Sequence, residues 1–245
     1  MKLIVSESHD PAYHLALEEH LFNQRDEEFA LFYVNSPCVI VGCNQVWENE
    51  VDVSFCKKHQ IPVLRRMSGG GAVYHDHGNM NYCFITNQSG AETSLNAEFL
   101  KPVVIALSYF GFQPVVGKRK DLWLPDGYKI SGTASHIAAK RELHHGTLLF
   151  KTDLKKLIGA LNPKKKDLNI KGIASVPSPV KNISYYLKEY NLPRYETADF
   201  CRQFIRKIKP VLDLNASLVL DTHADEQIKS LAENKYRTDL WNKKK

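Results

Sequence analysis

Residues 65–76 read RRMSGGGAVYHD, which places two cations, three consecutive glycines and a strand-like apolar run within twelve positions. Glycine adopts positive φ at little cost and lets a backbone approach a ligand closely. Arginine beside such a loop can bind a phosphate or carboxylate through two parallel hydrogen bonds. The contiguous glycines match neither the G-x-x-x-x-G-K-[ST] nor the G-x-G-x-x-G phosphate signature. Alone, the stretch predicts either a tight hairpin turn with two solvated arginines or an anion site of another kind.

A second segment, residues 126–135, reads DGYKISGTAS and is followed by LHHGTLL at 143–149. Asp-Gly is a strong hairpin signal, so a return strand is expected to begin near Lys129. Strand alternation puts Lys129 and Ser131 on one face, and the small residues after them leave room for a ligand. The alternative is an exposed strand lysine, with His144 and His145 as an ordinary strand pair.

Taken together, these segments resemble the lipoate–protein ligase A family. The matching pieces are the loop at 65–79, GYKISGTA at 127–134, LHHGTLL at 143–149, and KGIASV at 171–176 followed by Asn182-Ile183. They keep the family's order and rough spacing over residues 35–183. The resemblance implies one catalytic domain over 1–245 of the α+β class. Its antiparallel sheet with flanking helices would be like that of biotin synthetases and class II aminoacyl-tRNA synthetases.

The resemblance also implies a reaction in two steps. Lipoate and ATP would give lipoyl-AMP, and the lipoyl group would then move to a lysine of an apo-lipoyl carrier domain. Such carriers are the E2 subunits of 2-oxoacid dehydrogenases and the H protein of glycine cleavage. Relatives with two domains carry a small C-terminal accessory domain, and this sequence ends about where that domain would begin. A separate accessory subunit is therefore an expected partner for adenylation.

Individual site residues also follow from the resemblance. Lys129 would be the catalytic lysine that contacts the lipoyl carboxylate and the α-phosphate. ATP or lipoyl-AMP would lie along Arg66, Ser68, Gly69, Gly70, Gly71, Ala72, Val73, Tyr74, Asn79, Asp121, Lys129, Ser131, Gly132 and Ala134. The lipoyl pocket would be lined by Gly70, His145 and Gly146. Asp121 would hold Mg²⁺ together with the ATP phosphates, because Mg²⁺ prefers few carboxylates plus phosphate oxygens.

Three departures from the family pattern stand in the sequence. Residues 119–121 read RKD where relatives often have R-N-D, and 175–180 read SVPSPV where relatives commonly carry arginines. Cys43 stands where a basic residue is usual. An octanoyl or lipoyl transferase is one alternative, but it would use a cysteine near the family lysine or after the H-G pair, and neither place holds one. A non-catalytic or incomplete subunit is the other.

Composition sets the outer bounds. The 245 residues are 43% hydrophobic and 24% charged, which is ordinary for a single globular domain. No stretch approaches the roughly 20 apolar residues of a membrane span, and the amino-terminal apolar run is too short for a signal peptide. We therefore expect a cytoplasmic enzyme without membrane contact.

The net charge of +6 comes with no nucleic-acid-binding module and suits acidic partners. The five cysteines show no C-x-x-C spacing, which predicts free thiols. A turn is a better interpretation than a metal site for His75-Asp76-His77.

Hydrophobic patterning predicts the secondary structure. Asp10-Pro11 is typical of a helix start, and Asp76-His77-Gly78 predicts a hairpin between strands at 72–75 and 81–85. Further strands are expected at 30–34, 38–41, 61–64, 114–116, 121–124, 129–136, 143–150 and 217–220. Helices are expected at 51–60, at 99–107, from 152 or 153 to 161, and through most of the chain after a loop at 162–180.

Overall fold

The computed structural model describes all residues except 25, 88–96, 165–171, 215 and 245. Within these ranges, six strands form a main sheet in the order β10-β11-β6-β2-β1-β12. Their bounds are Thr133–Ala138 (β10), Arg141–Leu149 (β11), Asn79–Asn87 (β6), Phe29–Tyr33 (β2), Lys2–Val5 (β1) and Ala216–Ser217 (β12). The pairs from β10 to β2 are antiparallel, whereas β1 pairs in parallel with β2 and with β12. The predicted α+β class is confirmed, with two parallel pairs at one edge of the sheet.

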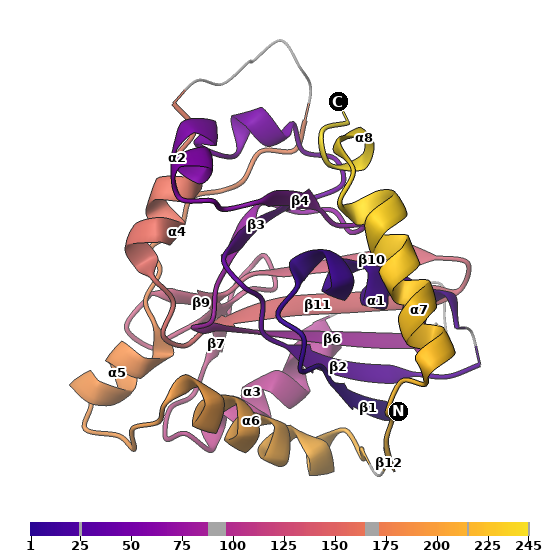
Figure 1. Ribbon diagram of the computed structural model, residues 1–245. Coiled ribbons are helices and arrows are strands. Elements are labelled where there is room, and N and C mark those ends of the chain that lie inside the picture. Colours follow the sequence, from indigo (N-terminus) through magenta and orange to yellow (C-terminus); the bar gives the residue numbers. More distant parts are fainter. Residues whose placement is uncertain (25, 88–96, 165–171, 215, 245) are drawn as a thin grey trace.

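Helices cover the two faces of the main sheet (Figure 1). One face packs against α3 (Leu100–Ser108) and α6 (Thr197–Val211) in an apolar cluster that includes Phe32 and Phe84. The other face packs against α1 (Pro11–Asn23) and α7 (Thr222–Leu231), with Leu31 and Cys83 in that cluster. Neighbouring residues of β2 and β6 thus point to opposite faces, as the period of two requires.

Smaller sheets flank the main one in the described ranges, and between them they position the glycine loop and the candidate lysine. The first, in the order β4-β3-β5, consists of Val63–Arg65 (β4), Cys38–Val41 (β3) and Val73–His75 (β5). The second, in the order β7-β8-β9, consists of Val115–Val116 (β7), Leu122–Trp123 (β8) and Lys129–Ser131 (β9). The remaining helical segments are η1 Trp47–Asn49, α2 Val53–Lys58, η2 Ala97–Phe99, α4 Leu154–Ala160, α5 Ile183–Glu189, η3 Ala232–Tyr236 and α8 Asp239–Asn242.

Local capping signals were predicted correctly. The Asp10 carboxylate accepts a hydrogen bond from the Ala12 N–H at 3.0 Å, and Pro11 is the first residue of α1. The Asp153 carboxylate accepts from the N–H groups of Lys155 and Lys156 at the start of α4. Each cap satisfies donors that the first helical turn leaves without a partner.

The predicted hairpin between 72–75 and 81–85 is wrong, because its two strands lie in different sheets. β5 pairs with β3, whereas β6 pairs with β11 and β2. Asp76 holds the turn between the two sheets, with one carboxylate oxygen accepting from the Gly78 N–H and the other from the Asp153 N–H. A turn signal fixes local geometry but does not fix the partner of each strand.

The strand expected at 129–136 is interrupted at Gly132. β9 pairs with β8, and β10 pairs with β11, so the chain changes sheets within this segment. Gly132 stays tied to β11, because its N–H donates to the Thr147 Oγ1 at 3.0 Å and its carbonyl accepts from the Thr147 N–H at 3.0 Å. This divergence leaves open space beside the glycine loop.

Other differences are matters of length. The helix expected at 51–60 forms only over α2, and of the strand expected at 217–220 only Ser217 lies in a strand, at the end of β12. Part of the loop expected at 162–180 falls on 165–171, outside the described residues. No described helix is long and apolar enough to cross a membrane.

Candidate active site

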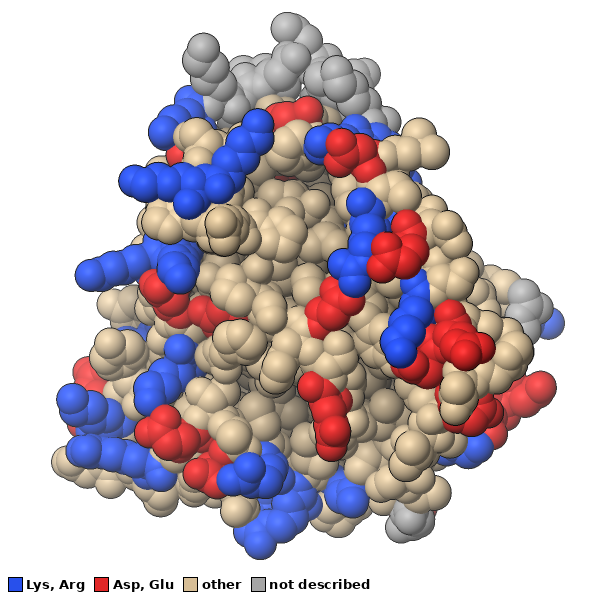
Figure 2. Space-filling model, viewed as in Figure 1, with Lys and Arg blue, Asp and Glu red and all other residues tan. Residues whose placement is uncertain are grey.

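A cavity of about 310 Å³ lies between the main sheet and the sheet that carries the glycine loop. We call it the glycine-loop cavity; its wall includes Gly70–Val73, His145–Thr147 and residues 173–176. A second cavity, of about 460 Å³, contains Lys129 and Ser131 and is bounded by α4, and we call it the lysine cavity. The two share wall residues, namely Ala72, Val73, Gly132, Thr147, Ser175 and Val176. Most of the middle of the face seen in Figure 2 is uncharged, with a few Asp and Glu side chains among the uncharged ones, and Lys and Arg are most numerous along its left and lower margins.

Arg66 organises the glycine loop from inside. Its guanidinium donates to the Ser68 Oγ at 2.9 Å, to the Gly71 carbonyl at 2.8 Å and to the Ile40 carbonyl at 3.2 Å. Burial lowers the pKa of this guanidinium to about 10, a value at which it remains charged at neutral pH. Arg66 also reaches the wall of the glycine-loop cavity. The backbone carbonyls of the loop are therefore held inward, which leaves Gly70 with a φ of +85°.

Arg65 is buried as well and serves a different purpose. It donates to the carbonyls of Gly42 and Asn242, and its backbone N–H donates to the Asn242 side chain. This arrangement joins β4 to α8 near the carboxyl end of the chain. The alternative of two solvated arginines at a hairpin turn is therefore wrong for both residues, since Arg65 is 0% and Arg66 4% exposed.

His145 is fixed at the cavity wall by a buried polar network. Its Nδ1 lies 2.9 Å from the Glu18 Oε2, and its Nε2 lies 2.7 Å from the Ser68 Oγ. Tyr33 donates its hydroxyl proton to the Glu18 Oε1 at 3.0 Å. Burial acts to raise the pKa of Glu18, but His145 and the hydrogen bonds outweigh it and hold that pKa below its ordinary value. Glu18 is therefore a buried carboxylate with its charge compensated.

Ser68, His145 and Glu18 have the spacing of a serine–histidine–acid relay, but the surroundings argue against nucleophilic catalysis. Ser68 is 0% exposed, and its Oγ already accepts a hydrogen bond from the Arg66 Nε. A nucleophile must reach the substrate as well as its base. The geometry instead makes this network a rigid wall for whatever occupies the cavity.

Lys129 forms an ion pair at the junction of the two cavities. Its Nζ lies 3.1 Å from the Asp121 Oδ2, and the Arg119 Nη2 lies 3.6 Å from the same oxygen. The Trp123 indole donates to the Asp121 Oδ1 at 2.9 Å. Although burial opposes ionisation, the contacts with Trp123 and Lys129 keep the pKa of Asp121 below its ordinary value. Asp121 lines the glycine-loop cavity and Lys129 lines the lysine cavity, so the pair spans both.

The segment at 173–180 joins both candidate motifs. The Ser175 Oγ accepts from the Ala72 N–H at 2.8 Å and from the Gln45 side chain at 3.1 Å. Further along, the Pro179 carbonyl accepts from the Lys129 N–H at 2.8 Å. The stretch that departs from the family by its prolines therefore holds the glycine loop and the lysine strand together.

Most predicted site residues line at least one of the two cavities. The glycine-loop cavity contains Arg66, Gly70, Gly71, Ala72, Val73, Asp121, Gly132, Ala134, His145 and Gly146, and the lysine cavity adds Tyr74, Lys129 and Ser131. In the described part of the chain, Ser68, Gly69 and Asn79 are not among the lining residues. Asn79 is buried, and its side chain donates to the Asn81 side chain within β6.

Sequence reasoning missed Glu18 and Ser175. Glu18 belongs to the buried face of α1, where a carboxylate among leucines was the available signal. Such a group is rarely buried unless it has a partner. Ser175 belongs to the KGIASV piece of the resemblance but was not among the predicted site residues, and only the tertiary structure brings it to the glycine loop.

Residues 10–209 match the model of the lipoyl protein ligase A/B catalytic domain. Lipoate-protein ligase LplJ of Bacillus subtilis is 37% identical over 237 residues, which cover 95% of this chain and 70% of that protein. Lipoate–protein ligase 1 of Staphylococcus aureus is 36% identical over 235 residues, with the same coverage.

Solved structures agree in fold. A bi-partite lipoate protein ligase described with its E2 lipoyl domain, from Thermoplasma acidophilum, superimposes with a TM-score of 0.83 at 25% identity, covering 99% of this chain and 95% of that one. A lipoate-protein ligase A bound with ATP gives a TM-score of 0.82 at 24% identity, covering 99% and 98%. Given the domain match and the relatives above 30% identity, this chain belongs to the lipoyl protein ligase A/B catalytic domain family.

Proposed function

We propose that this protein is an ATP-dependent lipoate–protein ligase, which forms lipoyl-AMP and transfers the lipoyl group to a lysine of an apo-lipoyl domain. The observation that carries the proposal is the Lys129–Asp121 ion pair, which spans two adjoining cavities. Two reactants held in adjoining sites can react without a diffusional encounter, which removes several kcal/mol of barrier.

In this arrangement the lipoyl chain occupies the glycine-loop cavity, with Gly70, His145 and Gly146 along it. The nucleotide lies along Ala72–Tyr74 in the lysine cavity. Lys129 is the catalytic residue, because its ammonium would face both the lipoyl carboxylate and the α-phosphate. A fixed cation stabilises the negative charge that builds on phosphorus during adenylation. The carboxylate attacks the α-phosphorus, the bond to the β-phosphate bridging oxygen breaks, and pyrophosphate leaves.

Asp121 is the carboxylate that the site offers to Mg²⁺. Its Oδ2 already faces Lys129 and Arg119, so it would supply at most one or two oxygens to a metal. Mg²⁺ commonly binds with few carboxylates when phosphate oxygens complete its coordination. We therefore propose that Mg²⁺ enters with ATP and that Asp121 orients the metal-bound triphosphate beside Lys129.

For the second half-reaction we propose apo-lipoyl domains as partners, of the E2 or H-protein kind, in the cytoplasm. The support is the Thermoplasma structure, which is described with an E2 lipoyl domain, together with the net charge of +6. The test is direct: purified protein is incubated with lipoate, Mg-ATP and an apo-lipoyl domain, and the carrier is weighed by intact-mass spectrometry. A carrier that stays unmodified both with lipoate plus Mg-ATP and with synthetic lipoyl-AMP would contradict the proposal.

The transferase alternative makes a different prediction about cysteines. In the described part of the chain no cysteine lines either cavity, and burial raises the pKa of the Cys56 and Cys201 thiols to about 11. Thiols of that kind are poor nucleophiles. We expect each single Cys→Ser variant to retain lipoyl transfer within about threefold of wild type. A thioester trapped on any cysteine by an octanoyl carrier would favour the transferase instead.

Adenylation is proposed to depend on a separate accessory subunit, as the bi-partite Thermoplasma ligase suggests. We expect transfer from synthetic lipoyl-AMP to the apo-carrier to proceed with this chain alone. The full reaction from lipoate and ATP should be slower, because ordering of a site on closure often limits the rate. The two half-reactions are measured on one preparation. Equal rates from lipoate plus ATP and from lipoyl-AMP would show that the chain is self-sufficient.

A further inference from the structure

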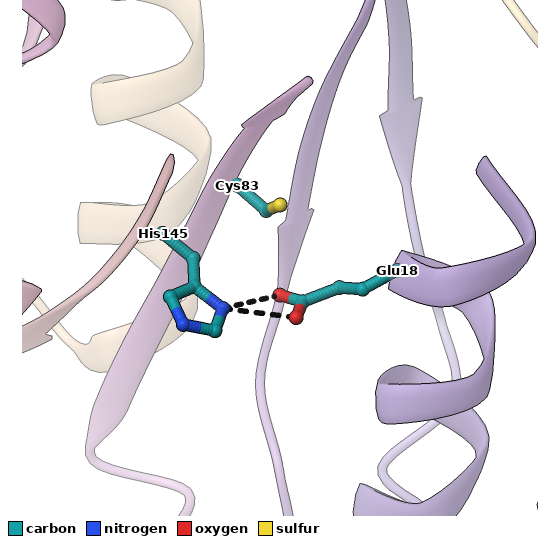
Figure 3. A group of neighbouring side chains, drawn as sticks. All are labelled: Glu18, Cys83 and His145. Atoms are coloured by element: carbon teal, nitrogen blue, oxygen red, sulfur yellow. Dashed lines mark hydrogen bonds and ion pairs between the residues drawn. The ribbon is translucent and has the colours of Figure 1, made fainter. Parts of the chain in front are cut away.

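Beside the glycine-loop cavity, three potential metal ligands come together from three elements. They are Glu18 of α1, Cys83 of β6 and His145 of β11, and Figure 3 shows their side chains converging. One donor atom from each lies within 4.8 Å of the other two. Glu18 and Cys83 are buried, whereas the His145 side chain is 12% exposed, and His145 lines the cavity. The ligase chemistry proposed above makes no use of Cys83.

We propose that these three residues bind one zinc ion, through a carboxylate oxygen of Glu18, the Sγ of Cys83 and the Nδ1 of His145. Zinc accepts mixed sulfur, nitrogen and oxygen ligands, whereas Mg²⁺ and Ca²⁺ require oxygen. Zinc–ligand bonds of about 2.0–2.3 Å put tetrahedral ligand atoms about 3.5 Å apart. The His145 Nδ1 and the Glu18 Oε2, now 2.9 Å apart, would have to move apart by roughly 0.6 Å, and no pair of the three donor atoms is more than 4.8 Å apart, so small side-chain rotations suffice.

A second observation supports a zinc site: hydrogen-bond partners for two of the three ligands are already in place. Metal-bound histidine generally donates its other ring N–H to a fixed acceptor, and metal-bound carboxylates are themselves hydrogen-bonded. Here the His145 Nε2 lies 2.7 Å from the Ser68 Oγ, so the Nδ1, which faces Glu18, is the nitrogen available to a metal. The Tyr33 hydroxyl donates to the Glu18 Oε1 at 3.0 Å. Two of the three ligands thus have the partners that a metal site requires.

The summed charge of the metal and its ligands also favours zinc at this buried position. Zinc with the Cys83 thiolate, the Glu18 carboxylate and neutral His145 sums to zero charge, which a buried site tolerates far better than a net charge. Cys83 would bind zinc as a thiolate, so binding must release the thiol proton into solvent. Metal affinity should consequently increase by about tenfold per pH unit for each proton released.

The test uses the full-length protein and Co²⁺ as a spectroscopic substitute for zinc. Titration of the metal-stripped protein should produce a sulfur-to-cobalt charge-transfer band that saturates at one Co²⁺ per chain and is displaced by Zn²⁺. Cys83→Ser should abolish the band and weaken binding by at least roughly 100-fold. Glu18→Gln, which keeps hydrogen-bonding capacity, should weaken binding while the band persists.

Cys38→Ser is the matched control, because Cys38 is also fully buried and belongs to the same apolar cluster as Cys83. It should leave the band and the affinity unchanged within about twofold, and circular dichroism should show all variants folded. The proposal is overturned if the wild-type protein gives no saturable band, or if Cys83→Ser retains it. Because Co²⁺ absorbance needs neither lipoate nor ATP, this result is independent of whether the ligase function is correct.

Discussion

Replacing Lys129 by alanine is expected to lower the rate of lipoyl-AMP formation by about 10²–10³-fold, while the protein remains folded. The proposed role gives the reason: the ammonium is the cation placed between the cavities, 3.1 Å from Asp121. Loss of this ammonium removes a fixed positive charge from the place where negative charge develops on the α-phosphorus during adenylation. The measurement is pyrophosphate release with lipoate and Mg-ATP, together with lipoate binding by calorimetry. Release at the wild-type rate would contradict the assignment of Lys129.

Lys181→Ala is the matched control for this variant. The two lysine side chains are equally exposed, at 20% and 19%, and each forms an ion pair with a nearby aspartate. Lys181 pairs with Asp126 and Glu189, and it is not among the residues that line either cavity. If the loss of any largely buried lysine in this region slowed pyrophosphate release, both variants would be slow. We expect only Lys129→Ala to affect pyrophosphate release.

A pH series separates catalytic loss from structural loss. Lys129 is among the contacts that hold the pKa of Asp121 below its ordinary value. A depressed carboxylate pKa adds stability above the unfolded-state pKa, and that stability disappears as pH falls through the folded-state pKa. The melting temperature of Lys129→Ala should therefore lie below wild type at neutral pH and converge with it in acid. The defect in adenylation should be present at neutral pH in fully folded protein.

The sequence predicted those features whose causes are local. Asp10 and Asp153 cap the helices that follow them, because a short carboxylate next to free N–H groups needs no distant partner. Asp126-Gly127 forms the expected turn, and Gly127 has a φ of +86°, which glycine tolerates best. His145, which the family resemblance and not the local pattern singled out, lines the glycine-loop cavity, whereas His144, its neighbour on β11, contacts the Ser135 Oγ.

What the sequence did not predict depends on non-local pairing. Strand alternation is the same whether β5 pairs with β6 or with β3, so the assumed hairpin was wrong. Gly132 reads as one small residue in a strand, and only the divergence of β9 from β10 makes it a boundary between sheets. The inward direction of Arg66 depends on carbonyls of residues 40, 69 and 71 that converge only after folding.

Gly70→Val is expected to reduce lipoate affinity by about 100-fold, more than it reduces nucleotide affinity. Gly70 has a φ of +85°, a region that costs an ordinary residue about 1–2 kcal/mol and a β-branched residue more. A Cβ at this position would lie 3.1 Å from the Arg66 Nη2 and 3.5 Å from the Ala134 Cβ. The valine methyl groups would extend from there into the glycine-loop cavity that Gly70 lines. The backbone strain and the filled space are therefore both expected to reduce the affinity for lipoate.

Gly69→Ala separates these effects from the mere loss of a loop glycine. A Cβ at Gly69 would meet no atom within 4 Å, and Gly69 is not among the glycines with positive φ. Its effect on lipoate affinity should be less than about tenfold, since neither strain nor a clash is introduced. Calorimetry with lipoate and, separately, with a non-hydrolysable ATP analogue measures both affinities for each variant. Equal losses of both ligands in Gly70→Val, with a lowered melting temperature, would indicate general unfolding of the loop. A selective loss of lipoate would place the lipoyl chain against Gly70, because the nucleotide is proposed to lie on the far side of Ala72 and Val73, in the lysine cavity.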